Sequence, residues 1–214
     1  MNQSRINTKP EILYEDEYFI IVHKEPEELT VPGRGPDKMN CLMSRTALFY
    51  PEVYNIHRLD QPTSGLVVIA LSKEMQRSLS ILFQDRKIEK EYIALVEGQL
   101  SEDSGIIELP LRADIDNRPV QVVDREQGKK AITRWSVVEK LDSCTRVLLK
   151  PETGRTHQLR VHQKAMGHPI LGDRLYNDKV PDDLMGELKL HAMSLKFEHP
   201  VTGELVSVRK EPRF

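Results

Sequence analysis

The chain has 214 residues and a formal net charge of −2, with 39% apolar and only 6% aromatic residues. This length allows one good-sized domain or two small ones, with a core built mostly from Ile, Leu and Val. No stretch approaches the roughly 20 apolar residues of a membrane span, and the polar first ten residues lack the apolar region of a signal peptide. Two cysteines far apart argue against a disulfide scaffold or a thiolate metal site, so we expect a soluble, cytoplasmic protein.

The charged residues are distributed unevenly along the chain. The segment from Glu11 to Glu28 holds seven acidic residues and one lysine, whereas the segment from Arg146 to Lys164 holds five Lys or Arg residues and the single Glu152. A charge run usually forms a solvated face, but a locally basic face on an acidic protein can bind phosphates with an affinity that depends on salt. We therefore keep RNA as a candidate partner despite a pI near 6.4.

The first third of the chain predicts strands and loops. Residues 12–14 and 18–22 are apolar runs separated by Asp16-Glu17, which indicates a strand, a turn and a strand. Residues 32–36, with the sequence PGRGP, have the composition of a loop. The continuous apolar run 66–71 is typical of a buried strand.

A helix is expected directly after that strand. Ser72 can cap a helix over residues 73–84, because its apolar residues fall on one face. These residues are Met75, Leu79, Leu82 and Phe83. Further strand-like segments follow at 92–96, 106–109, 135–138 and 146–150.

The segment 156–166 is ambiguous between a strand and a helix. Leu159 and Val161 alternate as they would in a strand, but Thr156 as a cap and the Gly167 and Pro169 stop signals favour a short helix. Because strands dominate and connections are short, the chain predicts an α+β domain on a mixed or mostly antiparallel sheet.

The segment from His57 to Gly65, HRLDQPTSG, places a carboxylate at the junction of a loop and a buried strand. A carboxylate held there, with an arginine nearby, can stay ionised and point at a substrate. Taken alone, Asp60 is more often a turn residue and Arg58 a solvated side chain. The nonapeptide as a whole is far more specific than the Arg-x-Asp triplet.

This nonapeptide resembles the central motif of the RluA family of pseudouridine synthases. Four more segments match that family in the expected order: KEY at 90–92, PETGRTHQLRVH at 151–162, GHPILGD at 167–173 and LHA at 190–192. The resemblance covers about residue 12 to about residue 210. One departure lies at residues 24–28, KEPEE, where the family's N-K-P-x-G pattern has its proline moved and its glycine replaced.

The resemblance implies the pseudouridine synthase fold, a central mixed sheet with helices and loops around one active-site cleft. We expect residues 1–214 to form a single catalytic domain without the S4-type RNA-binding module that precedes it in many relatives. In this respect the chain resembles the ribosomal large subunit pseudouridine synthase A subgroup. That subgroup suggests two RNA partners, a hairpin of 23S ribosomal RNA and the anticodon loop of some tRNAs, without a membrane or an obligate protein partner.

The resemblance also assigns roles to four residues. Asp60 matches the catalytic aspartate and Arg155 the arginine that pairs with it. Tyr92 matches the aromatic residue that stacks on the flipped uracil, and its hydroxyl is a candidate base for the C5 proton. Arg58 matches the arginine that enters the RNA where the uridine leaves. The isomerisation involves no redox change and no group donor, so we expect no cofactor.

Five histidines in or near these motifs raise the alternative of a metal site. No H-E-x-x-H motif occurs, and His157 and His162 are five residues apart, which misaligns them on a helix. We therefore expect no metal, and expect His57 and His157 to orient loops through hydrogen bonds.

Two other functions stay open from the residues alone. A hydrolase could use Asp60 as a nucleophile on a nucleoside or an ester, and it would turn over free nucleosides. A non-catalytic RNA-binding module on the same fold would tolerate the loss of Asp60. Mapping pseudouridine in tRNA and rRNA after incubation with the protein separates all three functions.

Overall fold

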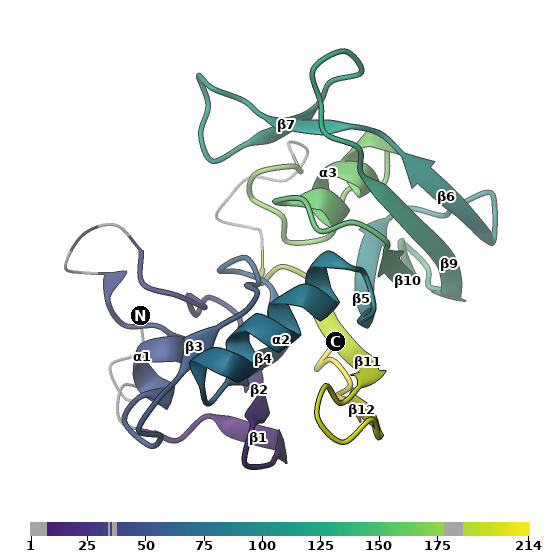
Figure 1. Ribbon diagram of the computed structural model, residues 1–214. Coiled ribbons are helices and arrows are strands. Elements are labelled where there is room, and N and C mark those ends of the chain that lie inside the picture. The colour runs from purple at the N-terminus through teal and green to yellow at the C-terminus, as the bar shows by residue number, and fades with distance from the viewer. Residues whose placement is uncertain (1–7, 34, 36–37, 178–185) are drawn as a thin grey trace. The chain divides into compact units, whose positions relative to one another are not determined.

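The computed structural model describes residues 8–33, 35, 38–177 and 186–214 (Figure 1). The chain forms two compact units, Met1–Glu89 with Ala192–Arg213, and Lys90–His191 with Phe214. Of the predicted loop at 32–36, Arg34 and Pro36 lie outside the described residues.

None of the helices in the described part of the chain is long and apolar enough to cross a membrane.

The strands of the first unit begin with an antiparallel hairpin, as predicted. Strands β1 (Glu11–Glu15) and β2 (Phe19–Lys24) pair on either side of a turn at Asp16. The Oδ1 atom of Asp16 accepts hydrogen bonds from the amides of Tyr18 and Phe19 at 2.7 and 2.8 Å. A short acidic side chain of this kind replaces main-chain partners in a tight turn, which explains the position of the turn.

The remaining strands of the first unit extend from β2. The hydrogen-bonded order is β1-β2-β4-β11, with β3 paired to β4 and β12 paired to β11. Their bounds are β3 (Tyr54–Asn55), β4 (Ser64–Ala70), β11 (Leu190–Glu198) and β12 (Leu205–Arg209). Strand β4 is the predicted buried strand, and every residue from Gly65 to Ala70 is buried.

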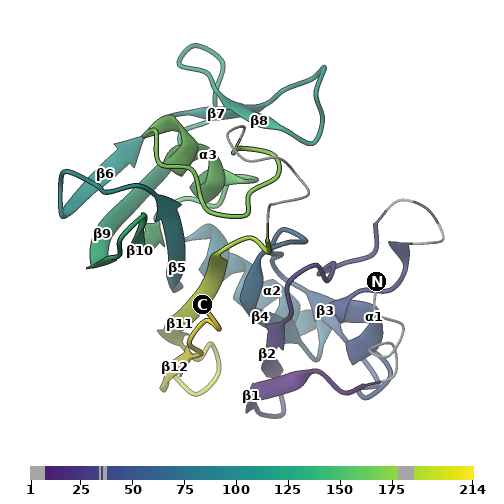
Figure 2. The same ribbon diagram turned by 180° about the vertical axis from the view of Figure 1, so that it is seen from behind.

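The described residues of the first unit form two helices, α1 (Leu42–Thr46) and α2 (Lys73–Gln84). The bounds of α2 match the prediction, and the Oγ atom of Ser72 accepts from the amide of Met75 at 3.1 Å. Figures 1 and 2 show α2 along one face of the strands. Met75 and Leu79 of this helix belong to the same buried core as Phe19 and Phe197. Burying each such side chain contributes about 1.5–3 kcal/mol.

In its described residues, the second unit contains four antiparallel strands of the main sheet, a two-stranded sheet and one helix. The sheet has the order β5-β10-β9-β6, and β7 pairs with β8 beside α3 (Figure 2). The strand bounds are β5 (Glu89–Glu97), β6 (Ser104–Glu108), β7 (Leu111–Ala113), β8 (Gln121–Val123), β9 (Ile132–Lys140) and β10 (Cys144–Pro151). The predicted strands at 92–96, 106–109, 135–138 and 146–150 fall on β5, β6, β9 and β10. Sequence analysis did not predict β3, β7, β8, β11, β12 or α1.

The ambiguous segment forms the helix α3 (Gln158–Ala165), but the predicted cap is wrong. His157 is the N-cap, in the left-handed conformation with φ 54°, and no side chain caps the first turn. The turn before the helix is organised instead by the buried Gln158, whose Oε1 atom accepts from the amide of Arg155 at 3.0 Å. The helix was correctly favoured, whereas Thr156 has no capping role.

Replacing Ser72 should measure how much its side-chain cap of α2 contributes to the free energy of unfolding. We expect Ser72→Ala to lower the free energy of unfolding by about 1 kcal/mol, because the amide of Met75 loses its acceptor. Ser80→Ala, in the interior of the same helix, is the matched control and should be neutral or slightly stabilising, since Ala has the higher helix propensity. Urea unfolding of the three proteins checks this; equal effects of the two substitutions would contradict it.

Candidate active site

Asp60 lies in the first unit, in the loop that joins β3 to β4. It is partly buried, Arg58 before it is exposed, and Leu59 between them is buried. The carbonyl of Asp60 accepts from the amide of Thr63 at 3.0 Å, which closes a turn just before β4. The predicted position of the carboxylate at a loop–strand junction is therefore confirmed.

The end of this loop requires glycine. Gly65 has φ 121°, a conformation that side chains with a Cβ atom rarely adopt, and a Cβ atom there would overlap the main chain of Ala192 in β11. The T-S-G part of the motif thus lets two strands approach closely directly after the loop.

His57 anchors the start of the loop. Its Nε2 atom accepts from the amide of Val68 in β4 at 3.0 Å, so this nitrogen carries no proton in that bond. Its ring stacks on Phe83 of α2, with centroids 4.5 Å apart. The expected hydrogen-bonding role of His57 is confirmed.

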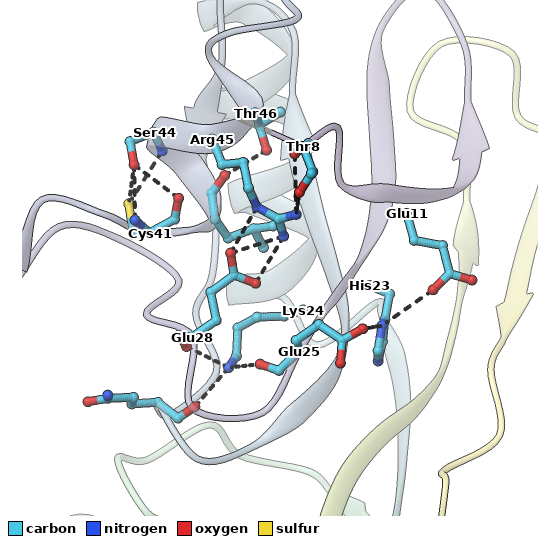
Figure 3. Close-up of polar contacts among 12 residues, drawn as sticks. Thr8, Glu11, His23, Lys24, Glu25, Glu28, Cys41, Ser44, Arg45 and Thr46 are labelled. Carbon is cyan, nitrogen blue, oxygen red and sulfur yellow. Dashed lines mark hydrogen bonds and ion pairs between the residues drawn. The ribbon is translucent and has the colours of Figure 1, made fainter. Parts of the chain in front are cut away.

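The most unusual group near the loop is the side chain of Lys24, at the end of β2, which has 0% exposure. Its Nζ atom donates to the carbonyls of Glu25, Glu28 and Gln61 at 2.9, 2.7 and 2.9 Å (Figure 3). Burial lowers the pKa of Lys24 to about 8, against the opposing effect of nearby carboxylates, chiefly Glu28 and Asp60. A buried ammonium is tolerated only with such partners.

Residues 25–28, where the sequence departs from the family pattern, form the turn around this ammonium. Glu27 has φ 61°, the left-handed conformation that glycine usually supplies, so a non-glycine residue there is strained. Arg45 of α1 makes a bidentate ion pair with Glu28, with Nε–Oε1 and Nη2–Oε2 distances of 3.0 Å (Figure 3). These contacts hold the turn in place without the glycine.

Tyr92 lies in the second unit, on β5. It is partly buried, faces Leu149 of β10 in register and packs against the core of that unit. Its neighbour Glu91 forms an ion pair with Lys150 at 2.5 Å. Tyr92 is thus held on a regular strand rather than on a loop.

Arg155 also lies in the second unit, in the exposed turn before α3. Its Nε atom donates to the carbonyl of Lys130 at 3.0 Å. The turn is fixed by the buried Gln158, whose carboxamide oxygen accepts from Thr153 Oγ1 and from the amide of Arg155. The Gln158 nitrogen donates to the carbonyl of Ile132 and the hydroxyl of Thr133. Gln158 therefore supports the arginine directly.

His157, next in the same motif, bonds to Tyr176. Its Nδ1 atom lies 2.7 Å from the Tyr176 hydroxyl, which also accepts from the amide of Gln121 at 2.8 Å. Two loops and the start of β8 meet at this hydroxyl. The expected role of His157 in orienting loops by hydrogen bonding is confirmed.

The basic segment from Arg146 to Lys164 does not form one charged face. Arg160 is only 3% exposed and makes a bidentate ion pair with the buried Asp173 at 2.8 and 2.7 Å. Arg146 and Lys150 pair with acidic side chains. The expectation of a locally basic face is therefore corrected for Arg160, which has a structural role.

The histidines make structural contacts in the described part of the chain. His162 bonds through its two ring nitrogens to the Thr133 hydroxyl and the Leu109 carbonyl, and burial lowers the pKa of His162. The Nδ1 atom of His168 lies 2.7 Å from the carbonyl of Glu97. Across residues 8–33, 35, 38–177 and 186–214, no three His, Cys, Asp or Glu side chains could hold a metal ion.

The four expected site residues are divided between the two units. Asp60 and Arg58 belong to the first unit, and Tyr92 and Arg155 belong to the second. Sequence analysis missed the supporting residues Lys24 and Gln158. For Lys24 a signal existed, since a lysine closes the strand FIIVHK, which begins with four apolar residues.

Comparisons with known proteins identify the protein family to which the chain belongs. A family model described as RNA pseudouridylate synthase matches residues 18–165. The chain is 44% identical to "Dual-specificity RNA pseudouridine synthase RluA" of Yersinia pestis over 95% of this chain and 99% of that protein. It is 43% identical to the protein of the same name in Escherichia coli (strain K12), over 95% of this chain and 93% of that protein.

A solved structure agrees. "Human RNA Pseudouridylate Synthase Domain Containing 1" superposes with a TM-score of 0.83 and 31% identity, covering all of this chain and 87% of that one. The chain belongs to the RNA pseudouridylate synthase family. It is an isomerase that converts uridine in RNA to pseudouridine, and both the resemblance and the α+β prediction are confirmed.

The buried ammonium should leave a signature in the pH dependence of stability. The folded-state pKa of Lys24, about 8, lies below its ordinary value of 10.5, so between these values the folded protein binds fewer protons than the unfolded chain. The free energy of unfolding of the wild type, relative to Lys24→Met, should therefore rise with pH across this window.

Urea unfolding of both proteins, in steps from about pH 7 to about pH 10, tests this linkage. Groups other than Lys24 titrate equally in the two proteins and cancel in the difference. A difference that stays flat would mean that Lys24 keeps its ordinary pKa in the folded state, and one that falls with pH would mean that its pKa is raised; either result contradicts the prediction.

Proposed function

We propose that this enzyme modifies two RNAs, a hairpin of 23S ribosomal RNA and the anticodon loop of tRNA. The observation that carries the proposal is the 44% identity, over nearly the whole chain, to a protein named as a dual-specificity RNA pseudouridine synthase. The motifs in the sequence point to the same subgroup. A short stem-loop is recognised mostly by its shape and by its unstacked bases, which suits a protein of 214 residues.

The two compact units together form the catalytic domain in this proposal. The family match covers residues 18–165 and so includes parts of both units, which supports treating them as one functional domain. We place the enzyme in the cytoplasm, where rRNA and tRNA are made in bacteria such as those of its relatives.

Asp60 is the catalytic carboxylate in this proposal. The reaction breaks the N1–C1′ bond, turns the uracil and forms a C5–C1′ bond, so the substrate loses and regains only one proton. A carboxylate can add to the substrate or stabilise the charge that develops on it. The loop around Asp60, closed by the bond from the Thr63 amide to the Asp60 carbonyl, supports this role because it fixes the main chain that carries the carboxylate.

Arg155, Tyr92 and Arg58 have supporting roles in this proposal. Arg155 matches the family's aspartate-pairing arginine, and its exposed guanidinium carries the positive charge that this role requires. Tyr92 stacks on the extruded uracil, and its hydroxyl takes the C5 proton. Arg58 fills the gap that the uridine leaves, and its exposure on the loop that carries Asp60 supports this role.

Asp60→Asn should abolish pseudouridine formation in both RNAs while RNA binding persists, because an amide keeps the shape of the side chain but is not a nucleophile. Pseudouridine is mapped in tRNA and rRNA from a strain that lacks the enzyme, after incubation with each protein. Asp85→Asn, an exposed aspartate after α2, is the control and should act like the wild type.

Two results would contradict these assignments. Turnover by Asp60→Asn within about tenfold of the wild type would remove the carboxylate from the chemistry. Modification of only one of the two RNAs by the wild type would leave the catalytic role intact and refute the dual specificity.

Tyr92→Phe separates stacking from proton transfer. Phenylalanine keeps the ring, a contact worth about 1–3 kcal/mol with a base, and removes the hydroxyl. We expect near-normal binding of a stem-loop with a loss of turnover of about 10²- to 10⁴-fold, and loss of both for Tyr92→Ala. Binding and single-turnover rates measured on the same RNA check this; normal turnover by the phenylalanine variant would leave Tyr92 as a stacking platform alone.

A further inference from the structure

The residue before Asp60 is held by one buried hydroxyl. Thr30 is 2% exposed, and its Oγ1 atom donates to the carbonyl of Leu59 at 2.9 Å and accepts from the amide of Leu59 at 3.2 Å. Both main-chain polar groups of Leu59 thus end on the same side chain, 29 residues away in the sequence. The peptide groups that flank Leu59 cannot rotate without breaking one of these bonds.

The residue after Asp60 is held by the buried ammonium. Lys24 donates to the carbonyl of Gln61 at 2.9 Å, and its two other bonds connect the same nitrogen to the carbonyls of Glu25 and Glu28 (Figure 3). Hydrogen bonds from a charged donor contribute roughly twice as much as neutral ones. The main chain on this side of Asp60 is therefore joined to the turn at 25–28.

The segment that carries Thr30 is itself fixed. The first two amides of α1 donate to the carbonyls of Leu29 and Thr30 at 2.8 and 3.1 Å. The Arg45–Glu28 ion pair joins the same helix to the turn around Lys24 (Figure 3). Thr30 and Lys24, which contact the Asp60 loop, therefore both lie in segments that α1 holds in place.

We propose that Thr30 and Lys24 are positioning residues that hold the main chain on both sides of Asp60 and so fix the direction of its carboxylate. The proposal rests on the catalytic role given to Asp60 under Proposed function. Neither side chain is required to touch the substrate. A displacement of about 1 Å in a reacting group can cost about 100-fold in rate, so loss of either contact should act on turnover rather than on binding.

Thr30→Val tests the proposal, because it keeps the shape of the side chain and removes the hydroxyl. We expect kcat to fall by roughly 10- to 100-fold, with KM for a stem-loop within about threefold of the wild type. Thr30→Ser retains the hydroxyl and should recover most of kcat. Rates are measured per folded enzyme, well below the melting temperature of each variant.

Thr145→Val is the matched control in the second unit. Thr145 is 0% exposed, and its Oγ1 atom also donates to a carbonyl, of Gly98 at 2.7 Å, and accepts from an amide, of Leu100 at 3.4 Å. The substitution removes the same two kinds of bond at a site remote in sequence from the Asp60 loop. It should lower the melting temperature about as much as Thr30→Val, with kcat within about twofold of the wild type.

Three outcomes would overturn the proposal: a normal kcat in Thr30→Val, an equal loss of kcat in Thr145→Val, or a rise in KM without a change in kcat. If Thr30→Val does not fold, Thr30→Cys replaces it, since the thiol is a weak donor of similar size. A normal kcat in Thr30→Cys would equally overturn the proposal, whereas a partial loss supports it. Failure of the catalytic role of Asp60 is seen separately, as turnover by Asp60→Asn.

Discussion

The first unit depends on one buried positive charge. Through hydrogen bonds, the ammonium of Lys24 joins the end of β2 and the turn at 25–28 to the loop that carries Asp60, where Gln61 lies 37 residues further along the chain. Burying a charge costs several kcal/mol unless its donors are satisfied, so all three carbonyls must stay in place for the fold to be stable. The constraint works in both directions: the loop positions the ammonium, and the ammonium positions the loop.

In the second unit, a neutral buried side chain fixes the turn that carries Arg155. The carboxamide of Gln158 makes two bonds through its oxygen and two through its nitrogen, and these connect the turn of Arg155 to the start of β9. A fully satisfied buried amide defines a single arrangement, because any rotation leaves a polar atom without a partner. The T-G-R-T-H-Q motif therefore combines one exposed charge with the buried group that supports it.

Charge alone is a poor guide to the RNA-binding surface of this enzyme. Arg160 is one of the five basic residues between Arg146 and Lys164, yet its guanidinium forms a buried ion pair with Asp173 in the second unit. Arg58 and Arg155, by contrast, are exposed. An overall charge of −2 is thus compatible with an RNA substrate, because a few exposed guanidinium groups can bind phosphates and bases whatever the net charge of the chain.

Features encoded by neighbouring residues could be predicted from the sequence by itself. The helix 73–84, the hairpin around Asp16 and the buried strand after Gly65 depend on local spacing, caps and turn residues, and the family followed from ordered motifs. The roles of Asp60, Arg58, Tyr92 and Arg155 rest on those motifs and stay predictions.

Only the tertiary structure decided the features that join distant parts of the chain. It showed that Lys24 and Thr30 hold the Asp60 loop, that Arg160 is buried, and that His157 rather than Thr156 occupies the N-cap position of α3. Each of these depends on partners between 13 and 37 residues away or on a turn organised from another strand, so no local pattern records them. Hydrogen-bond partners of buried polar groups are chosen by the folded chain as a whole, and that is why the sequence alone could not assign them.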